Sequence, residues 1–408
     1  MLATDNLSLM LASIDTCAVH AGRGDLADLG VHAPPLDLSS TYPVHDLAAG
    51  TASLDALAAG RAPGGGNPIY ARLHNPTVAR FETALAELEG AEAAVAFGSG
   101  MAALTAALLA TRLAEGGALR RHLVAVRPLY GGSDHLLDSG LLGFETTFAP
   151  VDGIAAALRP ETALVLVETP ANPTLELVDL EAVARQAGDV PLLVDSTFAT
   201  PVLQRPLRHG AAMVLHSATK FLGGHGDVVA GAVATSELWA ARLRQVRILT
   251  GAILHPLAGY LLHRGLPTLP LRVRAAQESA TFLAERLAAH PAVRRVLHPS
   301  RPGGDPHGLL GRQLAGPGAV LSFEVAGGHE SAAQVLSGVR LMTPAVSLGS
   351  VDTLIQHPAG LTHRLVADAE RERHGVTAGL LRVSVGLEDP RDLWADLASA
   401  LDRIPPRG

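Results

Sequence analysis

Residues 213–220 read Met-Val-Leu-His-Ser-Ala-Thr-Lys, a short apolar run followed by two hydroxyl side chains and an amine. Lys220 is the only lysine among the 408 residues, so the other 31 of the 32 basic side chains belong to arginine. Arginine can replace lysine in ion pairs, but its guanidinium stays protonated, whereas an amine with a lowered pKa can attack a carbonyl and form a Schiff base. The run therefore predicts a buried strand that brings a nucleophilic amine, Lys220, to the edge of a sheet.

Four further apolar runs of this kind lie upstream, bounded by turn residues and mostly separated by helical patterns of Ala, Leu, Arg and Glu. They are residues 93–97, 122–126, 164–168 and 192–195. Such alternation is typical of an α/β fold with a mostly parallel sheet covered by helices on both faces. Helices are predicted near 46–60, over 80–88, and from the glycine turn at 98–100 through Leu113.

The pattern of predicted helices and strands changes after about residue 265. A long helical pattern covers 272–289, and Pro-rich loops are predicted at 291–306. Strands follow at 319–325 and 381–385, with a final helix at 391–401. We therefore expect three parts, namely an N-terminal arm (1–66), an α/β domain that carries the site (67–265) and a smaller C-terminal α+β domain (266–408).

The composition excludes several classes of protein. With 48% hydrophobic and 17% charged residues, the chain can bury a sizeable core and is not disordered. Its net charge of −7 argues against a nucleic-acid partner. The single cysteine, Cys17, permits neither a disulfide framework nor a Cys-based zinc cluster. Because the N-terminus lacks a basic n-region and no run reaches the roughly 18 apolar residues of a membrane span, we expect a soluble, cytoplasmic protein without a membrane partner.

Two further features fall at the ends of predicted strands. Gly98-Ser99-Gly100 joins a strand to a helix N-terminus, where successive N–H groups and the helix dipole form a cradle for an anion such as phosphate. Asp195 ends the 192–195 strand, at the carboxyl edge where ligands bind in parallel sheets. An amine, a carboxylate and a phosphate cradle at neighbouring strand ends are what pyridoxal 5′-phosphate (PLP) requires for its aldehyde, its ring nitrogen and its phosphate.

The chain also resembles a known family in a series of long motifs that follow one another in order. They lie at residues 70–77, 98–101, 130–132, 168–173, 195–201, 216–227, 347–349, 356–363 and 381–389. The family is that of the PLP-dependent enzymes of Cys/Met metabolism, the trans-sulfuration enzymes, and the resemblance covers the chain from about residue 16. It implies PLP as cofactor and the aspartate-aminotransferase-like fold of type I, with PLP bound by the 67–265 domain.

The resemblance implies a role for each matched residue. Lys220 would form the Schiff base with the cofactor and shuttle protons, and Tyr130 would stack on the cofactor ring and act in proton transfer. Asp195 would pair with the ring nitrogen. The remaining cofactor contacts would come from Gly100, Met101, Ser217 and Thr219 at the phosphate and from Asn172 near the phenolic oxygen.

Substrate and partner contacts are implied in the same way. Arg382, with Ser347 and Tyr130 nearby, would bind the substrate α-carboxylate in the bidentate geometry that a guanidinium favours. Tyr70 and Arg72 would reach the phosphate in a neighbouring subunit. This implies a homodimer, and usually a homotetramer built as a dimer of dimers with shared active sites.

Other polar residues have plainer interpretations. His216, His225 and His357 do not have the spacing of metal ligands, so we expect structural hydrogen bonds and predict no metal site. Cys17 is expected to be an inert thiol.

The choice of reaction depends on the residues that would meet the far end of the substrate. Cystathionine carries a second ammonium and carboxylate there, and this chain has Ile69, Val346 and His135 where family members that handle it carry charged residues suited to those groups. A methylthio group would fit the apolar surface of Ile69 and Val346, whereas an unpaired ammonium would lose its hydration there. We therefore predict a carbon–sulfur lyase that catalyses α,γ-elimination of L-methionine, or homocysteine, to 2-oxobutanoate, ammonia and a thiol. Gly132 and the stretch 247–249 depart from the pattern of methionine γ-lyases.

Three alternatives stay open within the same chemistry: cystathionine γ-lyase or γ-synthase, O-acetylhomoserine sulfhydrylase, and an enzyme that acts on another γ-substituted amino acid. A PLP-binding regulator without catalysis belongs to a different class. The joint presence of Lys220, Asp195, Tyr130 and Arg382 disfavours it.

Overall fold

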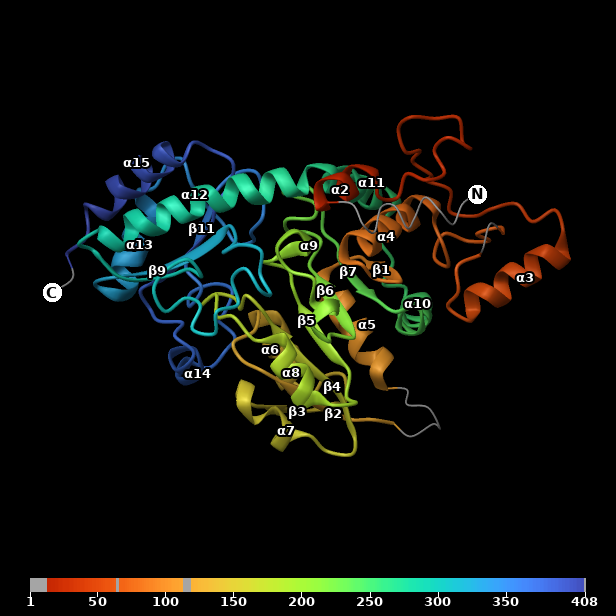
Figure 1. The fold of residues 1–408 in the computed structure, drawn as a ribbon, viewed down its shortest axis with the longest axis horizontal. Helices are drawn as coiled ribbons and strands as arrows, with labels where there is room; N and C mark the ends of the chain where they lie inside the picture. The colour runs from red at the N-terminus through yellow and green to blue at the C-terminus, as the bar shows by residue number, and fades with distance from the viewer. Residues whose placement is uncertain (1–12, 64–65, 113–118, 407–408) are drawn as a thin grey trace.

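A seven-stranded sheet forms the centre of the protein in a computed structural model that describes residues 13–63, 66–112 and 119–406 (Figure 1). In spatial order its strands are β1 (Ala93–Phe97), β7 (Gly231–Thr235), β6 (Met213–His216), β5 (Leu192–Asp195), β4 (Thr162–Glu168), β2 (His122–Ala125) and β3 (Glu145–Phe148). Strand β7 runs antiparallel to β1 and β6, and every other pairing is parallel. The carboxyl ends of β1, β2, β4, β5 and β6 therefore meet at one edge, and the predicted mostly parallel sheet is confirmed.

Helices cover both faces of this sheet, so that strands β1, β2, β4 and β6 are buried along their whole length. One face packs against α5 (Gly100–Arg112), α6 (Gly131–Asp138) and α10 (Glu237–Thr250). The other packs against α4 (Pro76–Glu89), α7 (Ile154–Ala157), α8 (Leu180–Ala187), α9 (Thr200–Leu203) and α11 (Pro256–Gly265). Short 3₁₀ turns lie at Val151–Gly153, Pro206–His209 and Leu266–Thr268.

Local sequence explains where these helices begin and end. The Asn75 side chain accepts hydrogen bonds from the first free N–H groups of α4, and Pro76 occupies the first turn, where no N–H is needed. Gly90 ends α4 in the left-handed conformation, with φ of 69°. The helix predicted after the glycine turn begins at Gly100, and the predicted end at Leu113 lies outside the described residues.

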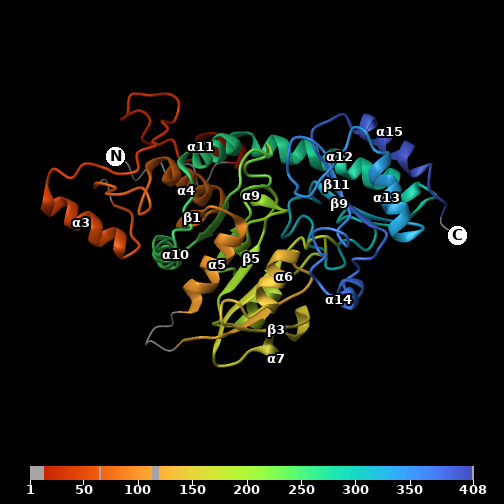
Figure 2. The same ribbon diagram turned by 180° about the vertical axis from the view of Figure 1, so that it is seen from behind.

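A second sheet of five strands lies toward the C-terminus (Figure 2). Its order is β10 (Thr343–Pro344), β11 (Leu354–Gln356), β12 (Leu380–Ser384), β9 (Val320–Val325) and β8 (Val293–Leu297). Helices α12 (Leu269–Ala289), α13 (Gly328–Gly338) and α15 (Pro390–Leu401) bury its core, and α14 (Asp368–Arg373) lies beside it. The smaller α+β part is confirmed, whereas the exact division at residue 266 stays a prediction.

One local prediction was wrong. The segment 291–306 was expected to be loop, but it contains β8, which pairs antiparallel with β9. Strand β8 lies at the edge of its sheet and carries the exposed side chains of Arg294 and Arg295, so its sequence does not read as an apolar run. Pairing with β9 supplies the order that the local sequence lacks.

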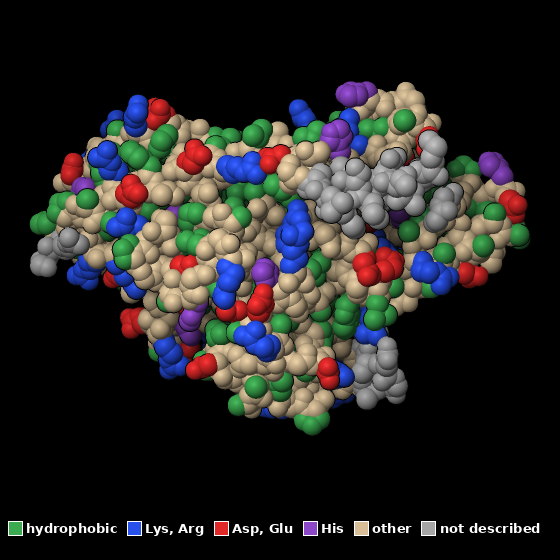
Figure 3. Space-filling model, in the orientation of Figure 1, with side chains coloured by type: hydrophobic (Ala, Val, Ile, Leu, Met, Phe, Trp, Pro, Cys, Tyr) green, Lys and Arg blue, Asp and Glu red, His purple; other side chains and the backbone are tan. Residues whose placement is uncertain are grey.

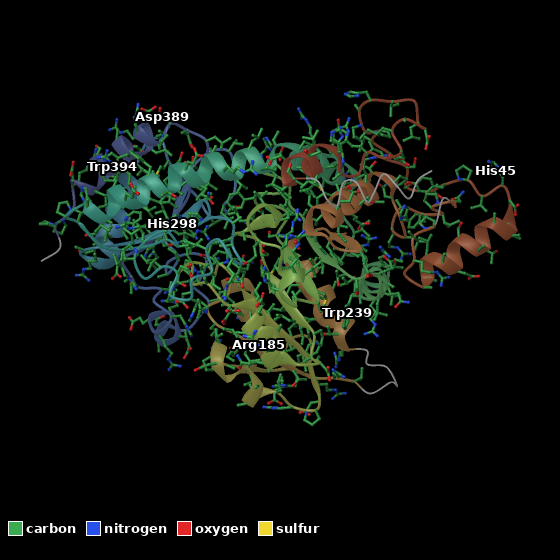
Figure 4. The ribbon with its side chains drawn as sticks, viewed as in Figure 1. His45, Arg185, Trp239, His298, Asp389 and Trp394 are labelled. Carbon is green, nitrogen blue, oxygen red and sulfur yellow. The ribbon has the colours of Figure 1, made fainter. Side chains whose placement is uncertain are left out.

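The N-terminal arm contains α2 (Ile14–His20), which packs against α4, and α3 (Leu47–Ala58), which stands apart from both sheets (Figure 1). His45, just before α3, lies at the opposite end of the molecule from Asp389 and Trp394 (Figure 4). Leu38, Leu47 and Leu54 of the arm are exposed. The arm is therefore an extension with uncovered apolar side chains.

The surface carries charges of both signs. Acidic and basic side chains are interspersed over the face in Figure 3. Within the part of the chain that the structure describes, no helix combines the length and apolar character needed to cross a membrane.

Candidate active site

The carboxyl edge of the large sheet opens into a cavity of about 490 Å³ at the boundary with the C-terminal part. Strand β4 ends at Glu168, β5 ends at Asp195, and the turn after β6 carries Lys220. Most of the predicted site residues line this cavity, namely Gly100, Met101, Tyr130, Asn172, Asp195, Ser217, Thr219, Lys220, Ser347 and Arg382. Residues up to 282 positions apart in sequence are thus brought to one place by the parallel strand order.

The Lys220 amine is poised to act as a nucleophile. Its Nζ donates a hydrogen bond of 2.6 Å to the Ser347 hydroxyl. Burial, and secondarily the nearby charge of Arg382, lower the pKa of Lys220 from its ordinary 10.5 to about 8. About a tenth of the amine is therefore neutral at pH 7, and this neutral form can attack a carbonyl.

Asp195 presents a carboxylate with one free oxygen. Both of its hydrogen bonds, from the Thr197 backbone N–H (3.0 Å) and the Thr197 hydroxyl (2.6 Å), go to Oδ1. Burial raises the pKa of Asp195 above its ordinary value, and the hydrogen bonds from Thr197 act in the opposite direction. A protonated ring nitrogen at Oδ2 would supply the cation that this buried carboxylate lacks.

Arg382 is fully buried and held from two sides. Its Nη1 donates to Asn172 Oδ1 at 2.9 Å, and its Nη2 donates to the Ser347 carbonyl at 2.5 Å. When the Gln356 amide oxygen is turned toward it, that oxygen lies 3.1 Å from Nη1 and 3.0 Å from Nη2. Burial lowers the pKa of Arg382 to about 10, so the side chain stays cationic at neutral pH and can bind a carboxylate in the cavity.

The start of α5 meets the turn after β6 where a phosphate would sit. A Cβ at Gly100 would lie 3.0 Å from the Ser217 Cβ and 3.1 Å from its Oγ, so glycine allows the two backbones to approach closely. Ser217, Thr219 and the first residues of α5 line one space, and the Thr219 hydroxyl donates to the Ala230 carbonyl at 3.1 Å. With the amine of Lys220 and the carboxylate of Asp195, this donor set fits the phosphate, aldehyde and ring nitrogen of PLP.

Two predicted cofactor residues lie outside this cavity. Tyr70 is 45% exposed, and the Arg72 guanidinium lies 5.7 Å from the centre of its ring. Arg72 also donates to the carbonyl of Ile248 at 2.7 Å. Their assignment to a neighbouring subunit stays a prediction.

The residues compared for substrate specificity also lie partly inside and partly outside this cavity. Val346 lines the cavity, whereas Ile69 and His135 do not. A Cβ at Gly132 would lie 2.6 Å from Tyr130 Cε1, so the glycine leaves room for the Tyr130 ring. Arg247 has a structural contact, because its guanidinium pairs with the buried Glu82 at 2.5 Å and donates to the Ala96 carbonyl at 2.9 Å.

The three histidines make the structural hydrogen bonds that were expected. His216 Nε2 lies 2.6 Å from Glu89 Oε1, His225 Nδ1 lies 2.7 Å from the Gly223 carbonyl, and His357 Nε2 lies 2.8 Å from the Ala378 carbonyl. Cys17 is buried, and burial raises the pKa of its thiol, which keeps it unreactive. Over the described ranges, no cluster of three His, Cys, Asp or Glu side chains could hold a metal ion.

Two residues of the site were missed by sequence reasoning. Thr197 links Asp195 to the next strand, because its hydroxyl also accepts from the Ser217 N–H at 2.9 Å. Glu168 is 6% exposed and lies opposite Asp195 in the β4–β5 pairing. The signal for Glu168 was present, since it ends a buried strand as Asp195 does.

The fold and the cavity define a class, the enzymes that hold PLP at the carboxyl edge of a mostly parallel sheet. Comparison with known proteins narrows it. The model of the family "Cys/Met metabolism PLP-dependent enzyme" matches residues 15–402, and the chain belongs to this family. The resemblance and the type I fold predicted from the motifs are thereby confirmed.

Individual relatives are similar along nearly their whole length. An L-methionine gamma-lyase of Streptomyces avermitilis is 61% identical over 96% of this chain and 90% of its own. One of Brevibacterium sandarakinum is 58% identical over 95% and 97%. Among solved structures, a cystathionine gamma synthase of Xanthomonas oryzae pv. oryzae in complex with aminoacrylate and cysteine matches with a TM-score of 0.85 and 37% identity, over 96% of this chain and 98% of its own.

Proposed function

We propose that this chain is a PLP-dependent carbon–sulfur lyase acting on L-methionine. The elimination takes up one water and releases methanethiol, 2-oxobutanoate and ammonia, and homocysteine would release hydrogen sulfide in place of methanethiol. The observation that carries the proposal is one cavity that combines Lys220, Asp195 and Arg382 with the apolar Val346, in a chain 61% identical to an L-methionine gamma-lyase.

The residues of the cavity suggest a separate role for each group in the elimination. Bound PLP would stabilise negative charge at the substrate Cα. Arg382 would hold the α-carboxylate, and the Asp195 carboxylate would keep a proton on the ring nitrogen of the cofactor. The Lys220 amine, with its pKa of about 8, would remove the proton at Cα, release it, and, once neutral again, remove one at Cβ.

The wall around Val346 favours a neutral substrate end. Val346, Leu361 and Val229 line the cavity with apolar surface. A methylthio group would lose little on contact with them, whereas a distal ammonium without a partner would cost about 1–3 kcal/mol or more. This is the physical basis for placing methionine ahead of cystathionine.

We further propose that the protein is a homotetramer built from dimers that share active sites. Support comes from the projecting arm with its exposed Leu47 and Leu54, and from the exposed Leu249 near the Arg72 contact at Ile248. Tyr70 and Arg72 would then contact the cofactor phosphate in the partner's cavity. A cytoplasmic location is supported by the buried, unpaired Cys17, which needs no oxidising compartment.

A side-by-side assay tests the proposed function. The cofactor-loaded protein receives L-methionine or L-cystathionine at matched concentrations, and 2-oxo acid and free thiol are quantified. Methanethiol and 2-oxobutanoate from methionine, with cystathionine poor, are expected. Preference for cystathionine, or reaction only with O-acetylhomoserine and sulfide, would replace the assignment by one of its relatives, and cofactor binding without any turnover would favour the regulator.

A further inference from the structure

Glu168 is a buried carboxylate that the reaction as described leaves without a role. It ends β4 directly opposite Asp195 of β5, and both side chains line the active-site cavity. Both oxygens of Glu168 are occupied. Oε2 accepts from the Tyr130 backbone N–H at 2.7 Å, and Oε1 accepts from the Asn172 backbone N–H at 2.8 Å.

These two N–H groups lie on separate segments of the site. Tyr130 immediately precedes α6, and its side chain forms one wall of the cavity. Asn172 lies on the loop after β4, and its side chain accepts from Arg382 at 2.9 Å. Through these two backbone contacts, the Glu168 carboxylate connects Tyr130 with Asn172. The Asn172 side chain in turn contacts the buried Arg382.

We propose that Glu168 is a positioning residue for the elimination, which fixes Tyr130 against the cofactor and Asn172 against Arg382 by accepting their two backbone N–H groups. The proposal rests on the function proposed above, but its first consequence is structural. Loss of one acceptor would loosen the Tyr130 wall or the Asn172–Arg382 contact while Lys220 and Asp195 remain in place.

The two adjacent carboxylates, Glu168 and Asp195, influence each other's protonation. Burial, and secondarily the charge of Asp195, raise the pKa of Glu168 well above its ordinary value, whereas its two N–H donors act in the opposite direction. Two buried like charges side by side are costly, so the pair favours retention of one proton.

Glu168→Gln removes one of these two acceptors. A glutamine keeps the size of the side chain but offers one acceptor and one NH₂ donor, so one of the two buried N–H groups loses its partner. Asp305→Asn is the matched control, because each Asp305 oxygen likewise accepts one backbone N–H (Leu309 and Leu310, both at 2.8 Å) and Asp305 does not line the cavity.

The experiment uses the cofactor-loaded enzyme and three readouts. They are the visible circular dichroism of the bound cofactor without substrate, kcat and KM for L-methionine, and the unfolding midpoint. Glu168→Gln is expected to reduce the cofactor dichroism and to raise KM on the order of tenfold, the effect of one lost buried hydrogen bond. Asp305→Asn is expected to change neither.

A double-mutant cycle with Asn172→Ala provides a test that overall stability cannot mimic. If Glu168 acts through Asn172, the effect of Glu168→Gln on KM will be clearly smaller in the Asn172→Ala background. If Glu168→Gln does not fold, Glu168→Asp, which keeps both acceptors on a shorter chain, is measured in the same cycle with a smaller effect expected.

Unchanged dichroism and KM would overturn the proposal, as would a lower unfolding midpoint alone or full additivity with Asn172→Ala. Failure of the proposed function gives a different result. The wild-type protein would then bind the cofactor without releasing thiol, while the dichroism of Glu168→Gln would still report on Tyr130.

Discussion

The Lys220 amine should take up PLP with a pH dependence that differs from that of an ordinary lysine. Its pKa of about 8 leaves about 9% of the amine neutral at pH 7, against about 0.03% for a pKa of 10.5. Since the neutral amine is the nucleophile, Lys220 should react about 300-fold faster at pH 7 than an exposed lysine of equal intrinsic nucleophilicity. The sign follows from the lowered pKa, so the rate should rise tenfold per pH unit below 8 and level off above it.

The assay is stopped-flow absorbance of the cofactor on mixing with the cofactor-free protein between pH 6 and 10. The same mixing with N-acetyl-lysine amide is the control, because the titration of PLP itself is common to both and divides out. Borohydride reduction followed by peptide mass mapping identifies the reacting side chain, and Lys220 is the only lysine that the label can occupy.

A ratio of the two rates that stays near one from pH 6 to 10 would refute the argument. It would mean that water reaches the amine in the cofactor-free protein and that neither burial nor Arg382 affects it as the structure indicates. A ratio of about 300 below pH 8 that falls at higher pH, with the label on Lys220, would support the environment described for this amine.

Three further variants test separate parts of the structure. Arg382→Ala should raise KM for L-methionine on the order of 100-fold in a protein that still folds and binds the cofactor, and an unchanged KM would move the carboxylate site elsewhere. Val346→Glu should raise the ratio of kcat/KM for cystathionine over methionine about tenfold. A constant ratio would mean that Val346 does not meet the distal end of the substrate. Arg247→Ala should lower the free energy of unfolding by about 3–5 kcal/mol in urea titration, since it leaves Glu82 buried without its cation, and a loss under about 1 kcal/mol would contradict that.

Much of the large sheet could be predicted because its inner strands are short apolar runs bounded by turns. Strands β5 and β6 have the predicted bounds, Leu192–Asp195 and Met213–His216. Strands β3 and β7 were not foreseen. Residues 145–147 are polar and partly or largely exposed, and residues 231–235 are small and gain their order from pairing on both sides with β1 and β6.

The reacting groups of the site could be predicted from the sequence, whereas the residue proposed to position them could not. Asp195 and Lys220 could be recognised because a carboxylate and an amine at strand ends carry their own chemical meaning. The role proposed for Glu168 required the register between β4 and β5 and the positions of two backbone N–H groups. No local pattern encodes the contact with Tyr130, which lies 38 residues from Glu168 in the sequence.

The neighbouring groups of Ser347 and Arg382 explain why position 220 carries the only lysine. Ser347 accepts from Lys220 through its hydroxyl and from Arg382 through its carbonyl, and it does so with φ of 90°, a strained conformation for a serine. Two cations are thus held on one residue in a buried cavity. Arg382 must remain charged there, and its pKa of about 10 ensures that it does. Position 220 must lose its proton under the same burial and repulsion, which an amine does readily and a guanidinium does not. A chain that uses arginine for its other 31 basic residues therefore had a chemical reason to retain lysine at position 220.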